Sequence, residues 1–255
     1  MPERPCRNRH DLLAAVARGR GTCRLGGHHL GDARGNRPPR RVRPTSPPCR
    51  LDPLRRTGRP AALLWSWFPG QEGGDAIADI LTGTEPGGRL PTTVPATEAD
   101  VPVLSTQPVD GTLDYAEGDL IGYRAYTVSA TAPLFPFGHG LSYTTWDYQD
   151  FVVTGDMERG LTVRVTIRNI GERSGREVVQ VYLDPDDGDE PQRLVGFAAV
   201  EAGASESVIA TITVPAHALT VWTPAGWAPR SGPHRLRVGR SAADLRLTAA
   251  VPRSS

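Results

Sequence analysis

Alternation of apolar and polar residues in the second half of the chain is the feature that most constrains its fold. In "LTVRVTIRN" (Leu161–Asn169), four apolar side chains at every second position face one way, and Thr and Arg face the other. Successive side chains of a β-strand point to opposite faces, so the pattern predicts a strand with one buried face. Similar patterns occur at Glu177–Pro185, Arg193–Ala202, Ser207–Pro215, His234–Gly239 and Leu245–Val251.

These segments predict a β-sandwich over residues 141–255. About seven short strands, with turn signals every 8–12 residues, are typical of an immunoglobulin-like sandwich. All three cysteines of the chain lie before residue 61, so no cysteine pair spans the sandwich. The pattern therefore excludes the disulfide-bonded antibody type. The fold class that we expect is mainly β, with this sandwich preceded by a partial α/β unit and a disordered N-terminus.

Residues 61–140 are predicted to form the partial α/β unit and a connector. The apolar run "AALLWSWF" (Ala61–Phe68) is of strand length and is apolar on both faces, as in a buried strand of an α/β sheet. A helix follows within Gly70–Gly83, with Asp75 near its start, Gly83 as its stop and an apolar stripe of Ala76, Ile77, Ile80 and Leu81. "RLPTTVP" (Arg89–Pro95) indicates a short edge segment. One strand and one helix have too few neighbours to be stable alone.

Residues 1–60 differ sharply from the rest. They hold fifteen Arg, four acidic residues and no aromatic residue, a net charge of +11, whereas the whole chain carries +1. Such a segment cannot bury enough apolar surface to offset the entropy of ordering, and we predict disorder. Only His10–Arg20 could form a short helix. A second interpretation stays open: the segment is not natural protein but a GC-rich gene read in the wrong frame or from the wrong start.

Other roles for residues 1–60 are disfavoured. A basic arm that binds nucleic acid would need interleaved aromatic residues or a recognisable motif, and neither is present. A zinc site is also disfavoured, because no C-x-x-C step occurs among the candidate ligands Cys6, Cys23, His28, His29 and Cys49. The N-terminus lacks the apolar core of a signal peptide, and no apolar run approaches the roughly 18 residues of a membrane span. We therefore expect neither a nucleic-acid nor a membrane partner.

Three strings resemble family 3 glycoside hydrolases, the β-glucosidase and β-xylosidase-type enzymes, in the same order along the chain. They are "WFPGQEGGDAIADILTGTEPGGRLPTTVP" (Trp67–Pro95), "YAEGDLIGYRAY" (Tyr115–Tyr126) and "PLFPFGHGLSYTTW" (Pro133–Trp146). The first resembles the close of the family's α/β-sandwich domain, and many members carry a fibronectin type III-like domain after the third. The Pro, Phe and Gly residues of the third string predict a rigid elbow between the α/β unit and the sandwich.

The resemblance implies a substrate but supplies no catalytic residue. A retaining glycosidase needs two carboxyl groups about 5–5.5 Å apart. The resemblance implies a nucleophilic Asp in a Ser-Asp-Trp-like string of a (β/α)₈ barrel, and this chain has neither the string nor the roughly 250 residues of a barrel. Glu117 is the nearest match to the acid/base Glu, but Glu117-Gly118-Asp119 lacks the Asp-Arg step. We therefore assign no catalytic, cofactor-binding or metal-binding residue.

Other polar candidates have structural interpretations. Glu72 is expected to accept backbone N–H bonds in the turn or at the helix start, and Arg124 to pair with Glu117 or Asp119. We expect His139, in the elbow, to be structural or solvent-facing rather than in contact with substrate. "DPDDGDEP" (Asp184–Pro191) is expected to be a solvated loop, with calcium binding as the disfavoured alternative.

Two functions stay open at this stage. The first is a C-terminal part of a glycoside hydrolase acting on β-linked glucosides or xylosides, inactive alone, whose partner is a β-linked oligosaccharide or glucoside. The second is a non-catalytic β-sandwich module that binds carbohydrate or protein, with Trp222 and Trp227 as the best aromatic pair for a sugar. For these two we favour core or loop packing. No phosphate-binding loop ending in Lys, H-E-x-x-H or G-x-S-x-G string occurs.

Overall fold

The computed structural model of the chain describes residues 14–18, 23–24, 40–41, 43–45, 62–68, 70–103, 107–129, 131–185, 190–230 and 234–251. The chain divides into two compact units. The first consists of Met1–Arg89 with Gly140–Tyr143, and the second of Leu90–His139 with Thr144–Ser255. Residues 90–139, which the sequence placed with the α/β unit, thus lie with the sandwich. The predicted elbow holds the boundary between the units, because the division falls between His139 and Gly140.

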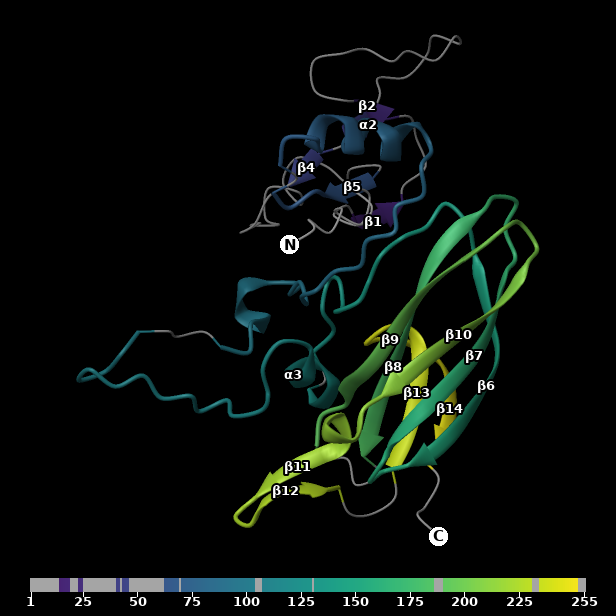
Figure 1. The fold of residues 1–255 in the computed structure, drawn as a ribbon. Helices are drawn as coiled ribbons and strands as arrows, with labels where there is room; N and C mark the ends of the chain where they lie inside the picture. Colours follow the sequence, from purple (N-terminus) through teal and green to yellow (C-terminus); the bar gives the residue numbers. More distant parts are fainter. Residues whose placement is uncertain are drawn as a thin grey trace, which may run out of the picture. The chain divides into compact units, whose positions relative to one another are not determined.

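Seven strands in two sheets form the sandwich of the second unit (Figure 1). One sheet has the order β10-β7-β6 and the other the order β14-β13-β8-β9. The strands are β6 (Trp146–Asp156), β7 (Gly160–Asn169), β8 (Gly175–Pro185), β9 (Arg193–Ala202), β10 (Ser207–Val214), β13 (His234–Ser241) and β14 (Asp244–Ala250). The predicted sandwich is therefore confirmed, and six of these strands match the segments read from alternation.

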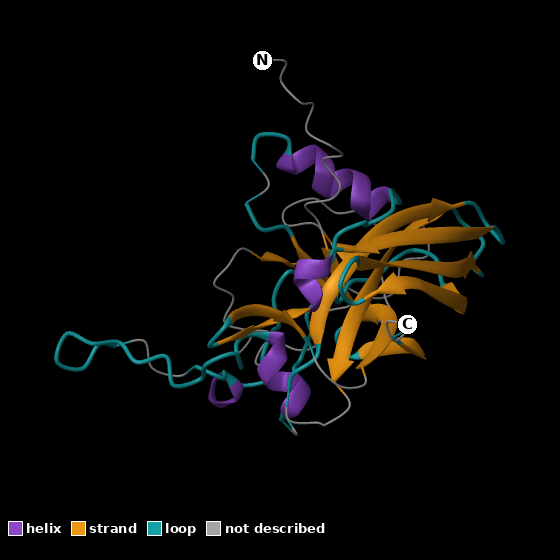
Figure 2. Ribbon diagram, turned by 60° about the horizontal axis from the view of Figure 1, so that its bottom comes forward, coloured by secondary structure: helices purple, strands orange, loops and turns teal. Residues whose placement is uncertain are grey.

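The core of the sandwich follows from that alternation. The apolar side chains of β7, namely Leu161, Val163, Val165 and Ile167, are each at most 1% exposed. They pack with the inward residues of both sheets, and Trp146 at the start of β6 is also buried. Figure 2 shows the strands as the dominant element of this unit. Each sheet therefore buries the face on which the sequence places its apolar residues.

Shorter elements lie around the sandwich. The second unit also contains the 3₁₀ helix η2 (Glu98–Asp100), the helix α3 (Tyr123–Val128), the 3₁₀ helix η3 (Ala216–Leu219) and a two-stranded hairpin of β11 (Thr220–Thr223) and β12 (Gly226–Pro229). Sequence reasoning did not predict this hairpin or delimit β6. A turn at Pro224-Ala225 joins the hairpin strands, and each strand is only four residues long.

The elbow runs antiparallel to the segment Leu90–Val94 within the second unit. Five backbone hydrogen bonds join them, including those from the Val94 N–H to the Phe135 carbonyl (2.8 Å) and from the Gly138 N–H to the Leu90 carbonyl (2.7 Å). Gly138 has φ +80°, and a Cβ there would overlap the Gln180 Oε1 atom. Glycine is therefore required at this position by both the backbone conformation and the lack of space.

In the first unit, β5 (Ala62–Trp65) and α2 (Gly73–Thr82) match the predicted strand and helix. Ala76 and Ile80 of α2 pack on Leu64, with Ile77 and Leu81 partly buried beside them. Gly83 ends the helix with φ 125°. Asp75 lies in its first turn, as predicted. The apolar stripe of α2 therefore covers β5.

Four short strands are described within the Arg-rich segment; two of them complete the sheet around β5, and the other two pair with each other in a separate two-stranded sheet. They are β1 (Ala14–Arg18), β2 (Cys23–Arg24), β3 (Arg40–Arg41) and β4 (Arg43–Thr45). The first pairs antiparallel and the fourth parallel with β5, which lies between them. The short helix predicted within His10–Arg20 is wrong in its described part, where the chain forms β1 instead. Strand β5 is buried, so its backbone N–H and C=O groups need partners, and β1 supplies some of them. The rest of that segment, with Cys6, His28, His29 and Cys49, lies outside the described residues.

Candidate functional site

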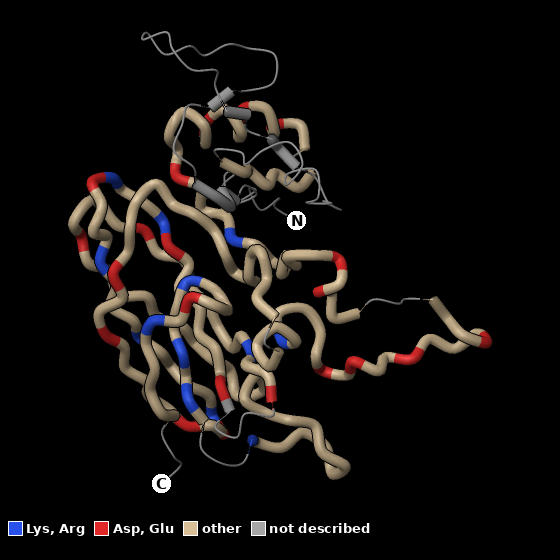
Figure 3. Tube along the Cα trace, turned by 180° about the vertical axis from the view of Figure 1, so that it is seen from behind, with Lys and Arg blue, Asp and Glu red and all other residues tan. Residues whose placement is uncertain are grey.

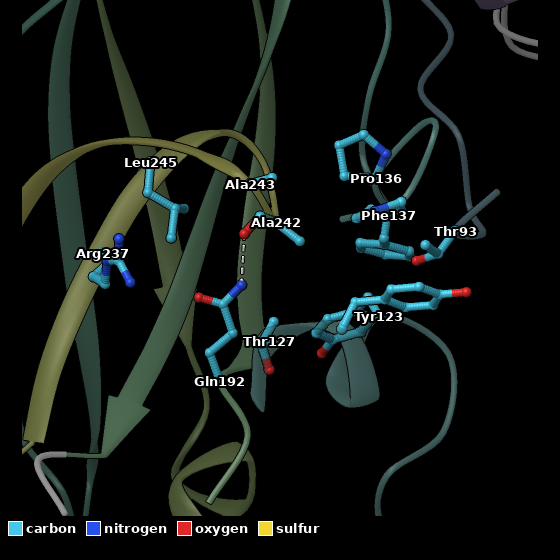
Figure 4. Close-up of a pocket in the computed structure, with 12 residues that line it drawn as sticks. Thr93, Tyr123, Thr127, Pro136, Phe137, Gln192, Arg237, Ala242, Ala243 and Leu245 are labelled. Carbon is cyan, nitrogen blue, oxygen red and sulfur yellow. Dashed lines mark hydrogen bonds between the residues drawn. The ribbon is translucent and has the colours of Figure 1, made fainter. Parts of the chain in front are cut away.

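A cavity of about 250 Å³ lies in the second unit, beside α3, the elbow and the turn between β13 and β14 (Figure 4). Its walls include Tyr123, Tyr126 and Thr127 of α3, Pro136 and Phe137 of the elbow, Gln192 before β9, Arg237 of β13 and Ala242, Ala243 and Leu245. This volume lies below the roughly 300–1,000 Å³ of pockets that take drug-sized ligands. A ligand of this cavity would therefore be small.

Tyr123 holds the wall of the cavity together. Its ring stacks on Phe137 with the ring centroids 4.7 Å apart, and it meets the edge of the Tyr182 ring at 6.2 Å. Its hydroxyl accepts a hydrogen bond from the Leu194 N–H at 2.8 Å. One aromatic side chain thus fastens α3 to the elbow and to β8 and β9.

Gln180 and Tyr182 form a buried polar network behind this wall. The Tyr182 hydroxyl donates to the Gln180 Oε1 atom at 2.7 Å, and the Gln180 Nε2 group donates to the Gly138 carbonyl at 3.1 Å and to the Arg240 carbonyl. Burial raises the pKa of Tyr182 well above its usual value, with a further contribution from Tyr123. Tyr182 therefore stays a neutral hydrogen-bond donor that fixes the Gln180 amide against the elbow.

The polar groups on the cavity wall are hydroxyl, amide and guanidinium groups. Tyr126 donates its hydroxyl proton to the Asp100 carbonyl at 2.7 Å, and burial followed by the Asp100 charge raises its pKa. Gln192 donates to the Ala242 carbonyl at 2.7 Å (Figure 4). Arg237 is the charged lining residue, and it pairs with Asp184 at 3.3 Å. None of the lining residues carries a carboxyl group, so the cavity lacks the acids of a two-carboxylate mechanism.

The carboxylates weighed from the sequence lie elsewhere. Glu117 and Asp119 belong to an acidic loop, which we define as residues 107–122, with four acidic residues and no basic one (Figure 3). Arg124 pairs with Asp119 at 3.8 Å, so the predicted ion pair is present in one of its two forms. Exposed apolar side chains share the loop, with Tyr115 72% exposed. Glu117 is half-buried there and lines no part of the cavity.

Glu72 corrects one expectation. It is the residue before the first turn of α2, but its carboxylate makes no capping hydrogen bond, and the side chain is exposed. The Glu72 carbonyl accepts the Ala76 N–H at 3.0 Å as the first hydrogen bond of the helix, and the Gly73 N–H of the first turn donates to the Gly70 carbonyl at 3.3 Å. The prediction is therefore wrong for the helix start, and its alternative, that the Glu72 side chain accepts N–H bonds in the turn, stays a prediction.

His139 and the loop after β8 have separate outcomes. The His139 ring stacks on Phe135, with centroids 5.6 Å apart and an interplanar angle of 23°, and its structural role stays a prediction. Most of the loop Asp184–Pro191 lies outside the described residues, so its predicted solvation stays a prediction. Within the described part of the chain, no group of three or more His, Cys, Asp or Glu side chains gathers as metal ligands do.

Trp222 and Trp227 correct a second expectation. Core or loop packing was favoured for them, but their side chains are 65% and 69% exposed. They sit opposite each other on β11 and β12, with ring centroids 5.4 Å apart and planes at 75°. Exposure arises because each strand places its Trp on the side away from half-buried Val221 and Ala228.

Sequence reasoning missed the cavity-lining residues Tyr126, Gln192 and Arg237. Tyr123 and Tyr126 were visible as an i,i+3 pair in "GYRAY", the spacing that places two side chains on one helix face. Gln192 and Arg237 carried no local sequence signal. They line the same cavity only because α3 packs against the sandwich, which brings together segments that are far apart in the sequence. Among the described residues, no helix has both the length and the apolar character needed to cross a membrane.

Comparison with known proteins agrees with this architecture. The family model of the glycosyl hydrolase family 3 C-terminal domain matches residues 44–143, and that of the fibronectin type III-like domain matches residues 177–242. The first match thus begins within the Arg-rich segment.

Individual relatives are longer than this chain. Beta-glucosidase B of Emericella nidulans is 37% identical over 205 residues, covering 72% of this chain and 24% of that protein. An exo-alpha-(1->6)-L-arabinopyranosidase of Bifidobacterium breve is 34% identical, covering 74% of this chain and 26% of that protein. The crystal structure of DesR, a beta-glucosidase from Streptomyces venezuelae in complex with D-glucose, superposes with a TM-score of 0.71 at 39% identity, covering 75% of this chain and 26% of that one.

The chain spans about a quarter of the length of these relatives. The two family matches follow each other in the order of the α/β unit and the sandwich. The chain therefore belongs to glycoside hydrolase family 3 and corresponds to the C-terminal portion of its members, the end of the α/β-sandwich domain followed by a fibronectin type III-like domain.

Proposed function

We propose that this chain is the C-terminal part of an enzyme that hydrolyses β-linked glucosides, and that it has no hydrolytic activity by itself. The observation that carries the proposal is the cavity beside α3, whose lining residues include no carboxyl group. Hydrolysis of a glycosidic bond by this family's retaining route requires two carboxyl groups facing each other across the sugar. The proposed role of the chain is to support catalytic residues that lie in other parts of the enzyme.

The positions of the candidate acids support the same proposal. Glu72 belongs to the first compact unit, whereas Glu117 belongs to the second. Glu72 is exposed at the start of α2, and Glu117 lies in the acidic loop. Neither residue lines the cavity beside α3. That the sugar is a glucoside is also part of this proposal. Relatives with similar sequence identity to this chain are named as a beta-glucosidase and as an arabinopyranosidase, so the family alone does not fix the sugar.

An assay of the purified chain with an aryl β-glucoside tests the lack of activity. We expect no release of the aryl group above that of a mock purification. The matched variants Glu117→Gln and Glu72→Gln are assayed in parallel. Turnover by the unchanged chain would overturn the proposal, and loss of that turnover in one variant would identify the acid that sequence and structure failed to assign.

The genomic DNA upstream of the Ala61 codon provides an independent test. We expect one of its reading frames to encode a (β/α)₈ barrel with the Ser-Asp-Trp-like string that the family resemblance implies. Finding no such coding sequence in any frame would contradict the proposal. It would instead favour the second candidate function, a binding module, for which the exposed Trp222 and Trp227 pair is the specific observation.

A further inference from the structure

The hairpin of β11 and β12 presents two indole rings to solvent. Trp222 and Trp227 are cross-strand partners, and their rings meet edge to face. Such a contact contributes to the stability of a short ribbon, because aromatic pairs attract beyond their buried area. It leaves about two thirds of each side chain uncovered, however. Stabilisation of the hairpin therefore explains why the two rings contact each other. It does not explain why most of their apolar surface is exposed to solvent.

The hairpin is fixed to the sandwich, so the two rings have a defined position. The Arg230 N–H donates to the Leu219 carbonyl at 3.2 Å, and Leu219 is fully buried in the sandwich core. The Arg193 guanidinium donates to the Thr220 carbonyl at 3.3 Å, which ties the first hairpin strand to β9. At the turn, the Thr223 hydroxyl donates to the Gly226 carbonyl at 2.8 Å. Both ends of the hairpin are therefore held, as a preorganised binding surface requires.

The surroundings of the rings favour an uncharged ligand. No residue from Thr220 to Pro229 is charged. Arg230, at the base of the hairpin, forms an ion pair with Glu190. Binding of nucleic acid relies on cations that contact phosphates, and the hairpin offers none. Two indole rings are also far smaller than the roughly 800 Å² that each partner buries in a stable protein–protein interface.

A pyranose sugar has the complementary chemistry. The ring of a β-linked glucoside carries its hydroxyl groups at the rim, and its axial C–H bonds form an apolar face. The negative face of an indole attracts these polarised C–H bonds, and stacking leaves the hydroxyls hydrated. Because the two indole planes stand at 75°, one ring can stack on the sugar while the other borders its edge. This geometry holds one sugar unit of a chain rather than a flat stretch of several.

We propose that Trp222 and Trp227 form a binding platform for a β-linked glucan, separate from the cavity beside α3. The choice of a glucan rests on the proposed function, whereas the platform itself rests on the exposed indoles and the uncharged hairpin. Its role is to hold a polysaccharide near the enzyme without cleaving it.

Isothermal titration of the full chain with cellohexaose and with laminarihexaose tests this platform, with tryptophan fluorescence as a second readout. We expect saturable binding of at least one of the two, with a dissociation constant on the order of 1 mM or below, typical of a small contact. Trp222→Ala and Trp227→Ala should each weaken binding at least about tenfold. Phe197→Ala removes an aromatic side chain that is 66% exposed on β9, and as the matched control it should leave the affinity unchanged.

Trp227→Tyr separates loss of the platform from loss of the hairpin, because tyrosine keeps an aromatic cross-strand partner for Trp222. This variant should retain the unfolding temperature and bind more weakly by a smaller factor than Trp227→Ala. No binding by the unchanged chain at about 10 mM hexaose, or equal binding by the double Ala variant, would overturn the proposal. Self-association that disappears in the double variant would do so as well. The aryl β-glucoside assay measures turnover instead, so the two proposals fail independently.

Discussion

The sandwich and the α/β unit differ in how completely they bury apolar residues. Seventeen buried apolar residues form one cluster in the sandwich, sixteen of them from its two sheets and Leu219 from η3. The corresponding cluster in the described part of the first unit consists of Leu64, Ala76 and Ile80. Since the stability of a domain comes mainly from burial of apolar surface, the comparison teaches that the sandwich can fold from its own residues, whereas the α/β unit depends on what pairs with β5.

Hydrogen exchange should show the largest contrast between the two units. The amides of Val163 and Val165 in β7 should exchange only through global unfolding of the sandwich. Amides of α2 should exchange on the order of a hundredfold faster, a difference of about 3 kcal/mol in opening free energy, because fewer buried contacts hold that helix. Mass spectrometry of peptides from the two segments makes the measurement. Equal protection of α2 and β7 would remove the contrast.

Truncation of Trp146 tests the core of the sandwich. This side chain is 1% exposed, and Trp146→Ala should lower the free energy of unfolding by about 4 kcal/mol through lost burial and a cavity. Phe197→Ala, on an outward position of β9, should change it by less than about 0.5 kcal/mol. Urea denaturation measures the free energy of unfolding of both variants. A similar decrease in both would show that the exposure of a side chain does not determine how much its truncation destabilises the sandwich.

The buried ion pair of Glu177 and Arg240 tests the electrostatics of the sandwich. Glu177 is fully buried, and one of its carboxylate oxygens lies 2.8 Å from the Arg240 Nε atom. Glu177→Gln should lower the free energy of unfolding by about 3 kcal/mol, because it leaves a guanidinium without its counter-charge. The double variant with Arg240→Met should recover part of that loss in urea denaturation. A double variant less stable than Glu177→Gln would contradict this reason.

Two glycines of the second unit separate steric conflict from backbone strain. Gly138→Ala places a methyl group against Gln180 at a positive φ, and it should lower the free energy of unfolding by about 2 kcal/mol. Gly118 has φ +52°, and a Cβ added there would meet no atom within 4 Å, so Gly118→Ala should cost about 1 kcal/mol or less. Thermal unfolding measures both, and equal costs would mean that Gln180 moves aside freely.

The smallest effect is expected at the turn between β6 and β7. The Asp156 carboxylate accepts the N–H groups of Arg159 (2.7 Å) and Glu158 (3.0 Å) and pairs with the Arg159 guanidinium, which lowers its pKa. Its contribution to stability is therefore present above the pKa of the unfolded chain and is lost as the pH falls through the lower folded value. NMR titration should give a midpoint below the usual value of about 3.9. A midpoint above that value would contradict the assignment.

The sandwich could be predicted because its signal is local. The alternation in Leu161–Ile167 predicts which face of the strand is buried without knowledge of its partner strands. In the same way, the apolar stripe with Ala76 and Ile80 predicts which face of α2 is buried. The hairpin of Trp222 and Trp227 had a weaker signal, since four-residue strands carry too few alternations to distinguish a ribbon from a loop.

The candidate site could be predicted only in part. Tyr123 and Phe137 stood in the quoted strings, and Phe137 was assigned to the elbow, but no role was predicted for Tyr123. Their contact with each other and with Tyr182 joins segments far apart in the chain, so no spacing rule could reveal it. The cavity is likewise a product of tertiary packing, which is why Gln192 and Arg237 carried no advance signal.

The division of the chain at the elbow has a practical consequence for dissecting the protein. Residues 90–139 belong to the sandwich unit, whereas residues 140–143 belong to the other. A recombinant piece starting at Thr144 would keep all seven sandwich strands but would lack Tyr123 and Phe137, which cover Tyr182, and the Gly138 carbonyl, which accepts a hydrogen bond from the Gln180 amide. Such a piece should be prone to aggregate. A piece starting at Leu90 would retain Tyr123 and Phe137, which cover Tyr182.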